Sequence, residues 1–222
     1  MGKLGQKHTS VTLIDVMGDD QTVVKAARVS FNKSDAWNSD RDTKLIQYLA
    51  QHSHWSPFSH CFATFRITAP IFVARQLGKH QVGLAWNEVS RRYVDGDVEF
   101  HIPEFWRGRP SNKKQGSHGI VDDTEGVVKH TYEDALRHCN DAYNALLNQG
   151  VAAEQARAVL PQSMMTSWYW SGSLYAFARV CNLRQHADAQ YETEIVAGQI
   201  SSHLRTKFPV SWKVLVDDKS SD

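Results

Sequence analysis

Residues 75–93 read RQLGKHQVGLAWNEVSRRY, the stretch of the chain in which basic residues are most concentrated around glycines and amides. It gathers five basic side chains around a short segment of small and amide residues: Arg75, Lys79, His80, Arg91 and Arg92. A basic cluster of this kind can simply be a solvated charged surface. It can also be a site that holds an anion.

Three features favour a binding site. An apolar run at 69–74, APIFVA, leads directly into the basic cluster, which predicts that the base of the cluster is buried. Gly78 and Gly83 allow the backbone to approach a ligand closely. The segment 87–92 then adds amide, carboxylate and hydroxyl groups to the charges. Together they predict a site for a phosphorylated small molecule that carries a ring.

Composition limits the classes of function. The chain has 222 residues, 41% of them apolar and 22% charged, which is typical of a globular protein. The formal net charge of +1 predicts no general field for nucleic acid, and no apolar run reaches the length of a membrane span. The three separated cysteines, Cys61, Cys139 and Cys181, indicate neither a disulfide framework nor a zinc motif. We expect a cytoplasmic protein with no membrane or nucleic-acid partner.

Periodicity and turn residues predict strands over 11–17, 61–68, 97–101 and 166–170. Helices are expected over 22–28 with a cap near Asp20 or Gln21, from a cap at Asp40 to about His52, from Pro70 to Lys79, over 152–159, and from a cap at Ser173 to Cys181. A helix over 127–148 is expected to bury a stripe made of Ala135, His138 or Cys139, Tyr143 and Leu146. A last helix over 189–208 is expected to bury the stripe Val196, Ile200, Leu204 and Phe208. Residues 106–126, rich in Gly, Lys and Ser, predict a long loop. The elements show no regular βαβ alternation, so we expect one α+β domain over 1–222, with a mixed sheet flanked by helices.

Several chemistries lack support in the sequence. No G-x-G-x-x-G motif follows a predicted strand, so a Rossmann cofactor site is not expected. The three histidines within 52–60 lack accompanying ligands at a metal-binding spacing. Neither Ser30 nor Ser90 lies in a G-x-S-x-G elbow, and no cysteine has an obvious base nearby. If the protein is an enzyme, binding, electrostatics and a cofactor would carry the reaction.

Two further arginines invite a functional interpretation. Arg157 ends an otherwise apolar helix, where a buried guanidinium needs an anionic partner. That partner can be a protein carboxylate such as Glu192 or the anion of a ligand. Arg184 lies between two predicted helices and can equally be a surface residue that caps helix carbonyls.

The sequence resembles the flavin-dependent thymidylate synthases, whose signature is Arg-His-Arg, seven or eight residues and a serine within Asn-Glu-x-Ser-x-Arg-Tyr. Here Lys79-His80-Gln81 is followed by eight residues and Ser90, within 87–93, NEVSRRY. Further blocks resemble the family in the same order, at 15–18, 26–31, 54–58, 69–76, 156–161 and 182–184. The resemblance extends over about residues 10 to 212.

The resemblance implies reductive methylation of dUMP to dTMP by a homotetramer. In this family FAD is the cofactor, 5,10-methylenetetrahydrofolate gives the carbon and NADPH gives the reducing equivalents, with no protein nucleophile. Position by position, it implies a catalytic role for Arg184, which would pair with the uracil edge. It implies dUMP binding by Gln76, Leu77, Gly78, Lys79, Glu88, Val89, Ser90, Arg91, Arg92 and Arg157. It implies flavin contacts from Ser56, Lys79, His80, Gln81, Glu88, Ser173, Leu174, Tyr175 and Arg179.

Four positions depart from the family pattern. Lys79 and Gln81 replace the two signature arginines, which removes the planar fork at one position and the charge at the other. Arg179 stands where many members have asparagine, and Asp188 where a histidine is common. We hypothesise that Arg179 restores the charge lost at Gln81. The departures leave two rival functions open, a flavin- and folate-dependent pyrimidine nucleotide hydroxymethylase and a dUMP-binding regulator that has lost flavin.

Overall fold

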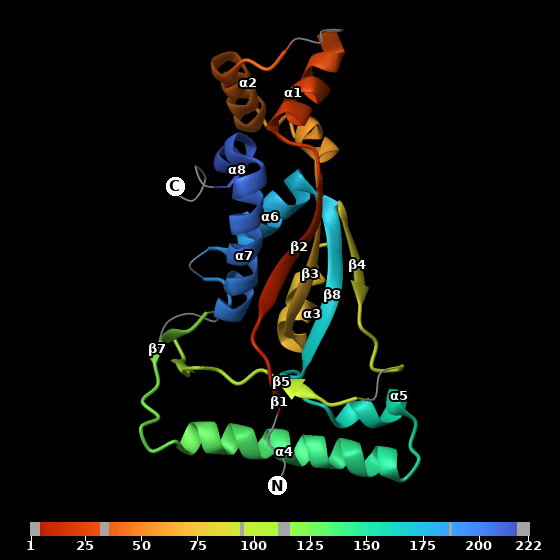
Figure 1. The fold of residues 1–222 in the computed structure, drawn as a ribbon. Helices are drawn as coiled ribbons and strands as arrows, with labels where there is room; N and C mark the ends of the chain where they lie inside the picture. Colours follow the sequence, from red (N-terminus) through yellow and green to blue (C-terminus); the bar gives the residue numbers. More distant parts are fainter. Residues whose placement is uncertain (1–4, 32–35, 94–95, 111–115, 187, 217–222) are drawn as a thin grey trace. The chain divides into compact units, whose positions relative to one another are not determined.

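The computed structural model of the chain describes residues 5–31, 36–93, 96–110, 116–186 and 188–216. Figure 1 shows its strands, which are β1 (Gly5–Gln6), β2 (Ser10–Met17), β3 (Phe62–Pro70), β4 (Leu84–Glu88), β5 (Glu99–Phe100), β6 (Arg107–Gly108), β7 (His118–Ile120) and β8 (Met165–Ser173). The α-helices are α1 (Asp20–Arg28), α2 (Ser39–Gln51), α3 (Ile71–Leu77), α4 (Val127–Asn148), α5 (Ala153–Ala156), α6 (Leu174–Arg184), α7 (Tyr191–Lys207) and α8 (Pro209–Leu215). Short 3₁₀ turns are η1 (Val29–Phe31), η2 (Ser56–His60) and η3 (Arg157–Val159). This mixture of helices and sheets confirms the predicted α+β class.

The described residues form two compact units, each assembled from separate stretches of sequence. The first contains the described parts of Met1–Thr9, Thr68–Leu77 and Glu88–Trp168. The second contains those of Ser10–Ile67, Gly78–Asn87 and Tyr169–Asp222. Strands β3, β4 and β8 carry residues of both units. That the two units make one domain stays a prediction.

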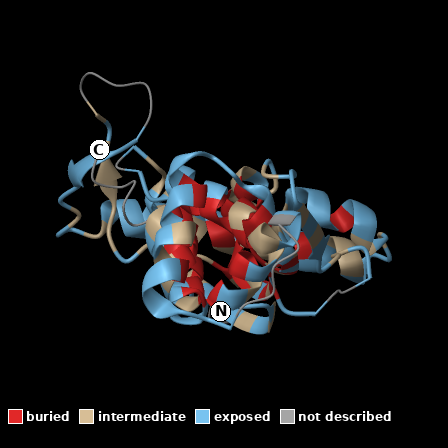
Figure 2. Ribbon diagram, turned by 90° about the horizontal axis from the view of Figure 1, so that it is seen from above, coloured by how far each residue is buried: buried red, intermediate tan, exposed pale blue. Residues whose placement is uncertain are grey.

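A four-stranded sheet has the order β2-β3-β8-β4. The two inner strands are the most buried, and Phe65 of β3 and Trp170 of β8 are fully covered. Figure 2 colours the buried segments red. β4 runs beside a glycine of β8, because a Cβ on Gly172 would lie 2.5 Å from the carbonyl oxygen of Gly83. The position therefore requires glycine. β4 is a strand that the sequence patterns did not predict.

Local caps fix the helix starts in the second unit. Asp19 caps α1: its side chain accepts from the N–H of Thr22 at 2.9 Å, and the Thr22 hydroxyl accepts from the N–H of Asp19 at 3.2 Å. α1 thus begins two residues before the predicted Thr22. Asn38, not the predicted Asp40, caps α2 and accepts from the N–H of Arg41 at 3.0 Å. These two predictions of the cap were wrong by one or two residues, a small shift that competing Asp and Asn side chains allow.

The C-terminal helices follow the predicted apolar stripe. Val196, Ile200, Leu204 and Phe208 are all fully buried, which confirms the stripe of α7. A further helix that the patterns did not predict, α8, starts at Pro209. Its first N–H groups, those of residues 210 and 211, donate to the buried carboxylate of Asp20 at 2.9 Å each. Asp20 therefore acts as the N-terminal cap of α8 from a distant part of the sequence.

The core of the first unit forms where α4 meets β5 and the start of β8. Its buried members are Val98, Phe100, Leu136, Tyr143, Ala156 and Met164. The bounds of α4 agree with the predicted helix. Of its predicted stripe, Tyr143 is buried and Leu146 packs against this core, whereas Ala135 and His138 are exposed and Cys139 is half-buried. Leu136, which was not predicted, is buried in the core. Among the helices that the structure describes, none is both long enough and apolar enough to cross a membrane.

The expected loop over 106–126 contains a small hairpin. β6 pairs antiparallel with β7, and Arg107 lies opposite Ile120. The prediction of a loop was therefore wrong at its two paired segments, which are too short to give a period-two pattern. Residues 111–115 lie outside the described part of the chain.

Candidate functional site

The first unit contains a cavity of about 500 Å³. Polar and charged residues make up nine of its fifteen lining residues, and the other six are apolar. The lining residues are Lys7, Thr68, Ile71, Glu88, Val89, Arg91, Glu99, Glu154, Arg157, Ala158, Leu160, Met164, Met165, Thr166 and Ser167. The structure thus brings together four of the residues that the sequence predicts for dUMP binding, Glu88, Val89, Arg91 and Arg157.

Hydrogen bonds to β8 fix the end of β4 at this cavity. The Thr166 hydroxyl donates to Oε1 of Glu88 at 2.8 Å, and the N–H of Val89 donates to the carbonyl oxygen of Ser167 at 2.9 Å. The Ser167 hydroxyl in turn lies 2.7 Å from that of Thr68 on β3. The Glu88 carboxylate is therefore held by the sheet, which reduces the entropy it loses when it binds a ligand.

The residues after β4 form a tight turn. The N–H of Arg92 donates to the Ser90 hydroxyl at 3.3 Å, and the Arg91 guanidinium donates to the carbonyl oxygens of Gly96 and Asp97. The Arg91 side chain is half-buried, and these two backbone acceptors fix its orientation. Its positive charge has no carboxylate among these partners, which leaves the charge available to an anion.

Arg157 lies on η3, and its side chain is exposed. The sequence argument for a buried guanidinium was therefore wrong. The reason is local, because the short helix turns Ala156 into the core and Arg157 outward. Nε of Arg157 donates to the carbonyl oxygen of Glu154 at 3.3 Å, and the Glu154 carboxylate lies 3.6 Å from Nε of Arg92. Both members of that ion pair are more than half exposed, so it adds little stability.

Two other predicted dUMP residues of this unit lie on α3. Gln76 is half-buried, and Leu77 is fully buried in the core. The base of the basic cluster is thus buried, as the apolar run predicts. The Leu77 side chain belongs to the core and not to the cavity, so only its backbone is available to a ligand.

The second unit holds a separate polar cluster at the end of α6. Nε of Arg184 donates to Nε2 of His80 at 3.0 Å. Burial, together with the positive charges of Arg184 and Arg179, lowers the pKa of His80 below its ordinary value. Burial also lowers the pKa of the Arg184 guanidinium, which stays protonated at neutral pH. Lys79, Gln81 and Arg179 are exposed.

The same unit contains a cavity of about 940 Å³ lined by basic, aromatic and hydroxyl side chains. Its lining residues are Ala26, Ala27, Arg28, Ser30, Arg41, Leu45, Tyr48, Leu49, Ser53, His54, Trp55, Ser56, Pro57 and His60. It includes Ser56, a predicted flavin contact. The Trp55 ring lies 6.2 Å from that of Tyr175, another predicted contact, with an interplanar angle of 32°. Arginines near flat aromatic rings are a donor set that suits a dinucleotide such as FAD.

Two predicted flavin contacts at the start of α6 are used by the fold itself. Ser173 caps the helix and accepts from the N–H of Ala176 at 3.2 Å, as the sequence predicts. Leu174 is buried, and its N–H donates to the carbonyl oxygen of Cys61 at 2.8 Å. Their side chains therefore stabilise the helix start, and their proposed contact with flavin stays a prediction.

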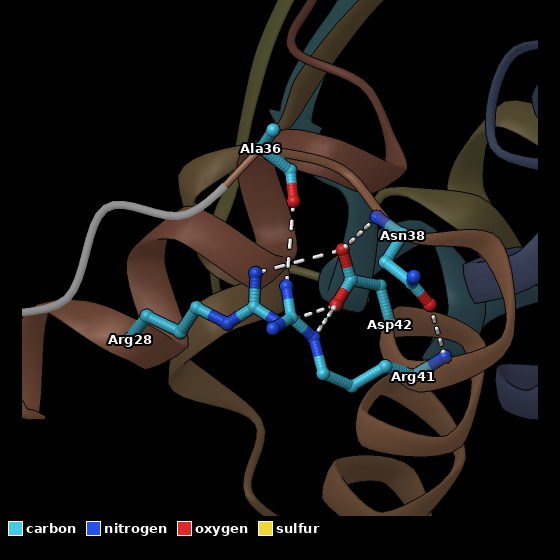
Figure 3. Close-up of polar contacts among 5 residues, drawn as sticks. All are labelled: Arg28, Ala36, Asn38, Arg41 and Asp42. Carbon is cyan, nitrogen blue, oxygen red and sulfur yellow. Dashed lines mark hydrogen bonds and ion pairs between the residues drawn. The ribbon is translucent and has the colours of Figure 1, made fainter.

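A network around Asp42 holds Arg28 and Arg41, two of the residues that line the second cavity (Figure 3). The Asp42 carboxylate is fully buried and accepts hydrogen bonds from the guanidinium of Arg28, from Nε of Arg41 at 3.2 Å and from the N–H of Asn38 at 2.8 Å. Burial raises the pKa of this carboxyl, but the hydrogen bonds from Asn38, Arg28 and Arg41 outweigh it, so the pKa is lowered. Asp42 thereby orients both cavity arginines.

Sequence reasoning missed this network, and it also missed Thr166, Ser167 and Lys7 at the first cavity. Asp42 has a weak signal in the sequence, since a carboxylate one turn into an amphipathic helix is ordinary. Thr166 and Ser167 lie in a predicted strand, where hydroxyl residues have no distinctive pattern. Among the described residues there is no group of three or more His, Cys, Asp or Glu arranged to hold a metal ion.

Comparisons with known proteins identify the family of this chain. The family model described as "Thymidylate synthase complementing protein" matches residues 12–210. A flavin-dependent thymidylate synthase of Kosmotoga olearia is 40% identical over 210 residues, which are 93% of this chain and 90% of the relative. One of Thermus thermophilus is 38% identical over 202 residues, 91% of this chain and 73% of the relative.

A solved structure is also similar. The crystal structure of the UMP/dUMP methylase PolB from Streptomyces cacaoi bound with 5-Br dUMP has a TM-score of 0.86 and 31% sequence identity, and the match covers 96% of both chains. The same methylase bound with 5-Br UMP gives a TM-score of 0.85. Since the family model and the relatives each extend over most of the sequence, this chain belongs to the flavin-dependent thymidylate synthase family.

Proposed function

We propose that this chain catalyses the reductive methylation of dUMP to dTMP, with FAD as cofactor and with 5,10-methylenetetrahydrofolate and NADPH as co-substrates. The observation that carries the proposal is the first cavity, which combines Arg91, Arg157 and Glu88 at a size suited to a small ligand. The family membership supports the reaction, and the similarity to PolB bound with 5-Br dUMP supports the substrate.

The cavity residues suit a nucleoside monophosphate. Arg91 and Arg157 supply charge for the phosphate, and a guanidinium binds phosphate through paired N–H groups. The Glu88 carboxylate, fixed by Thr166, can accept a hydrogen bond from a sugar hydroxyl. In this proposal the Ser90 hydroxyl and the N–H groups of Ser90 and Arg91 complete the phosphate contacts, while Val89, whose N–H is bonded to Ser167, lines the cavity with its side chain.

Arg184 has the proposed catalytic role. Its guanidinium would bind the pyrimidine edge and stabilise the negative charge that develops on the ring. When bound, FAD supplies the hydride that reduces the transferred carbon. The chain needs no thiolate for this chemistry, and burial with the charges of Asp19 and Asp20 raises the pKa of Cys61 to about 12, so this thiol stays protonated.

Flavin would be held by the second unit's exposed cations and by the lining of the larger cavity. Because Lys79 and Gln81 replace the two signature arginines, the charge of Arg179 becomes important in this proposal. That charge acts on the imidazole of His80, as the charge of Arg184 does. We expect Arg179→Ala to weaken FAD binding at least about tenfold, the value of one charged hydrogen bond. Lys25→Ala, an exposed cation on α1, is the control. Unchanged FAD affinity in Arg179→Ala, measured by flavin fluorescence, would show that Arg179 does not compensate.

The family resemblance also leads us to propose a homotetramer with active sites shared between subunits. This assembly would let residues from different copies complete one site. Sedimentation velocity of the purified protein tests it, and a monomer at micromolar concentration in the presence of FAD would contradict it.

Turnover with dUMP, methylenetetrahydrofolate, NADPH and FAD tests the reaction, with the product identified by mass. Formation of dTMP supports the proposal. Formation of 5-hydroxymethyl-dUMP instead would indicate the hydroxymethylase, and a colourless protein that binds dUMP but not FAD would indicate the regulator. Because PolB has been crystallised with 5-Br UMP as well as 5-Br dUMP, UMP is included as a second substrate.

A further inference from the structure

The contact between Arg184 and His80 has a direction that the chemistry of the two side chains determines. An arginine side chain donates hydrogen bonds and does not accept them. Nε of Arg184 lies 3.0 Å from Nε2 of His80, so this imidazole nitrogen must carry a lone pair. The proton of the neutral ring is therefore on Nδ1.

The surroundings keep the imidazole neutral. Both side chains are half-buried, and the charged groups that lower the pKa of His80 are Arg184 and Arg179, which both lie on α6. Lys79, which precedes His80 in the sequence, is a third positively charged residue next to this histidine in the chain. A protonated imidazole would lose its acceptor and would repel these charges. Neutral pH thus maintains the hydrogen bond, and acid breaks it.

The hydrogen bond also fixes the arginine. A free arginine side chain samples many rotamers, whereas one held at Nε has the plane of its guanidinium defined. Within the described part of the chain, no other hydrogen bond to this guanidinium is present. Its two terminal Nη groups consequently remain available to a ligand, in a fork whose orientation the imidazole sets.

We propose that His80 is the positioning residue for Arg184. By accepting the Nε–H, the imidazole aims the Nη groups at the two carbonyl oxygens of a pyrimidine ring, and protonation of the imidazole releases the arginine. The proposal rests on the proposed function, because it takes Arg184 as the group that binds the pyrimidine. It adds a role for His80 that contact with flavin does not require.

Two substitutions separate positioning from packing. His80→Gln retains a neutral acceptor that reaches about as far as Nε2 and does not titrate, while His80→Leu removes the acceptor. His130→Gln is the matched control, since His130 is exposed on α4. Each variant is assayed for kcat and KM with dUMP at saturating FAD over an acid-to-alkaline pH series, with flavin content measured by absorbance.

If His80 positions Arg184, His80→Leu lowers kcat at least about tenfold and changes the KM for dUMP less than about threefold. His80→Gln keeps kcat within about threefold of the wild type at neutral pH. The wild type and the His130→Gln control lose activity at acid pH, and His80→Gln lacks that loss. Should His80→Leu not fold, the pH profile of His80→Gln decides alone.

Nitrogen-15 NMR of the wild-type protein gives a readout independent of turnover. We expect the His80 Nε2 signal at the position of an unprotonated nitrogen at neutral pH. A proton on Nε2 of His80 at neutral pH would overturn the proposal. So would a His80→Gln variant that loses activity at acid pH as the wild type does. The third such outcome is a His80→Leu variant that binds flavin more weakly but has an unchanged kcat at saturating FAD. A wild-type enzyme that makes no dTMP would refute the proposed function instead, and the NMR result would still test the pair.

Discussion

Replacing Asp42 by asparagine tests whether the network in Figure 3 stabilises the protein through its charge. The amide that replaces the carboxylate has nearly the same shape and can still accept a hydrogen bond from the N–H of Asn38. The guanidinium groups of Arg28 and Arg41 would lose their anion. Arg28 is 11% exposed and Arg41 is 50% exposed, so most of the cost comes from Arg28.

Leaving a buried charge without its partner costs about 3–5 kcal/mol. Because the Arg41 guanidinium can be solvated in the variant, we expect a loss at the lower end of this range, about 3 kcal/mol in the free energy of unfolding at neutral pH. For a chain of this length that corresponds to a fall of about 6–12 °C in Tm. Urea and thermal unfolding measure it at one protein concentration, because assembly would shift both. Asp40→Asn, on the exposed face of the same helix, should cost less than about 1 kcal/mol.

The pH dependence has a definite sign. The pKa of Asp42 is lower in the folded protein than in the unfolded chain, so its contribution is complete above the unfolded pKa and is lost as the pH falls through the folded pKa. The difference between wild type and Asp42→Asn should therefore be constant at neutral pH and should shrink below about pH 4. A difference below about 0.5 kcal/mol at neutral pH, or one that grows in acid, would refute the reasoning.

Three further perturbations test the fold. The pKa of Cys61 is raised to about 12, so Cys61 should resist iodoacetamide in mildly alkaline buffer until the protein unfolds, while the half-buried Cys139 reacts earlier. Peptide mass spectrometry detects the order of alkylation, and early alkylation of Cys61 would contradict its burial. Gly172→Ala should lower the free energy of unfolding by about 2–3 kcal/mol, because its Cβ would overlap a carbonyl oxygen, whereas Gly96→Ala, with open space around it, should be nearly neutral. Asp20→Ala should cost about 1–2 kcal/mol by removing the cap of α8, and an unchanged urea midpoint would show that the cap does not stabilise.

The elements predicted well from the sequence are those whose information is local. α4 has an apolar period and a glycine at its end, and α6 has Ser173 immediately before its first turn. α4 was predicted with the bounds observed. The start of α6 was also predicted correctly, but the helix continues past the predicted end at Cys181 and includes Arg184, which was expected between two helices. α8 and β4 were not predicted, because long-range partners determine them. The cap of α8 is Asp20, 190 residues away from the N–H it accepts, and β4 exists through its pairing with β8.

In the candidate site, too, the local sequence indicated part of the answer and long-range contacts determine the rest. The resemblance identified Glu88 and Arg157, and the structure brings both to one cavity. It could not show that Thr166, 78 residues further along the chain, holds the Glu88 carboxylate. Nor could it show the exposure of Arg157, since its apolar neighbours in sequence predict burial and only the geometry of η3 decides which of them face the core. The sequence therefore indicated candidate site residues, whereas the contacts that hold them depend on residues far away in the sequence.

The spacing within the signature segment has a physical reason in β4. The part before this strand carries His80, which hydrogen-bonds Arg184, and the part after it carries Arg91, which lines the first cavity. Eight residues separate Gln81 from Ser90, and five of the eight form β4. Because side chains alternate between the faces of a strand, a single inserted residue would turn Glu88 away from its partner on β8. The identity of the residues before β4 can therefore vary, as it does here at Lys79 and Gln81, while the pairing of β4 constrains the number of residues within the strand itself.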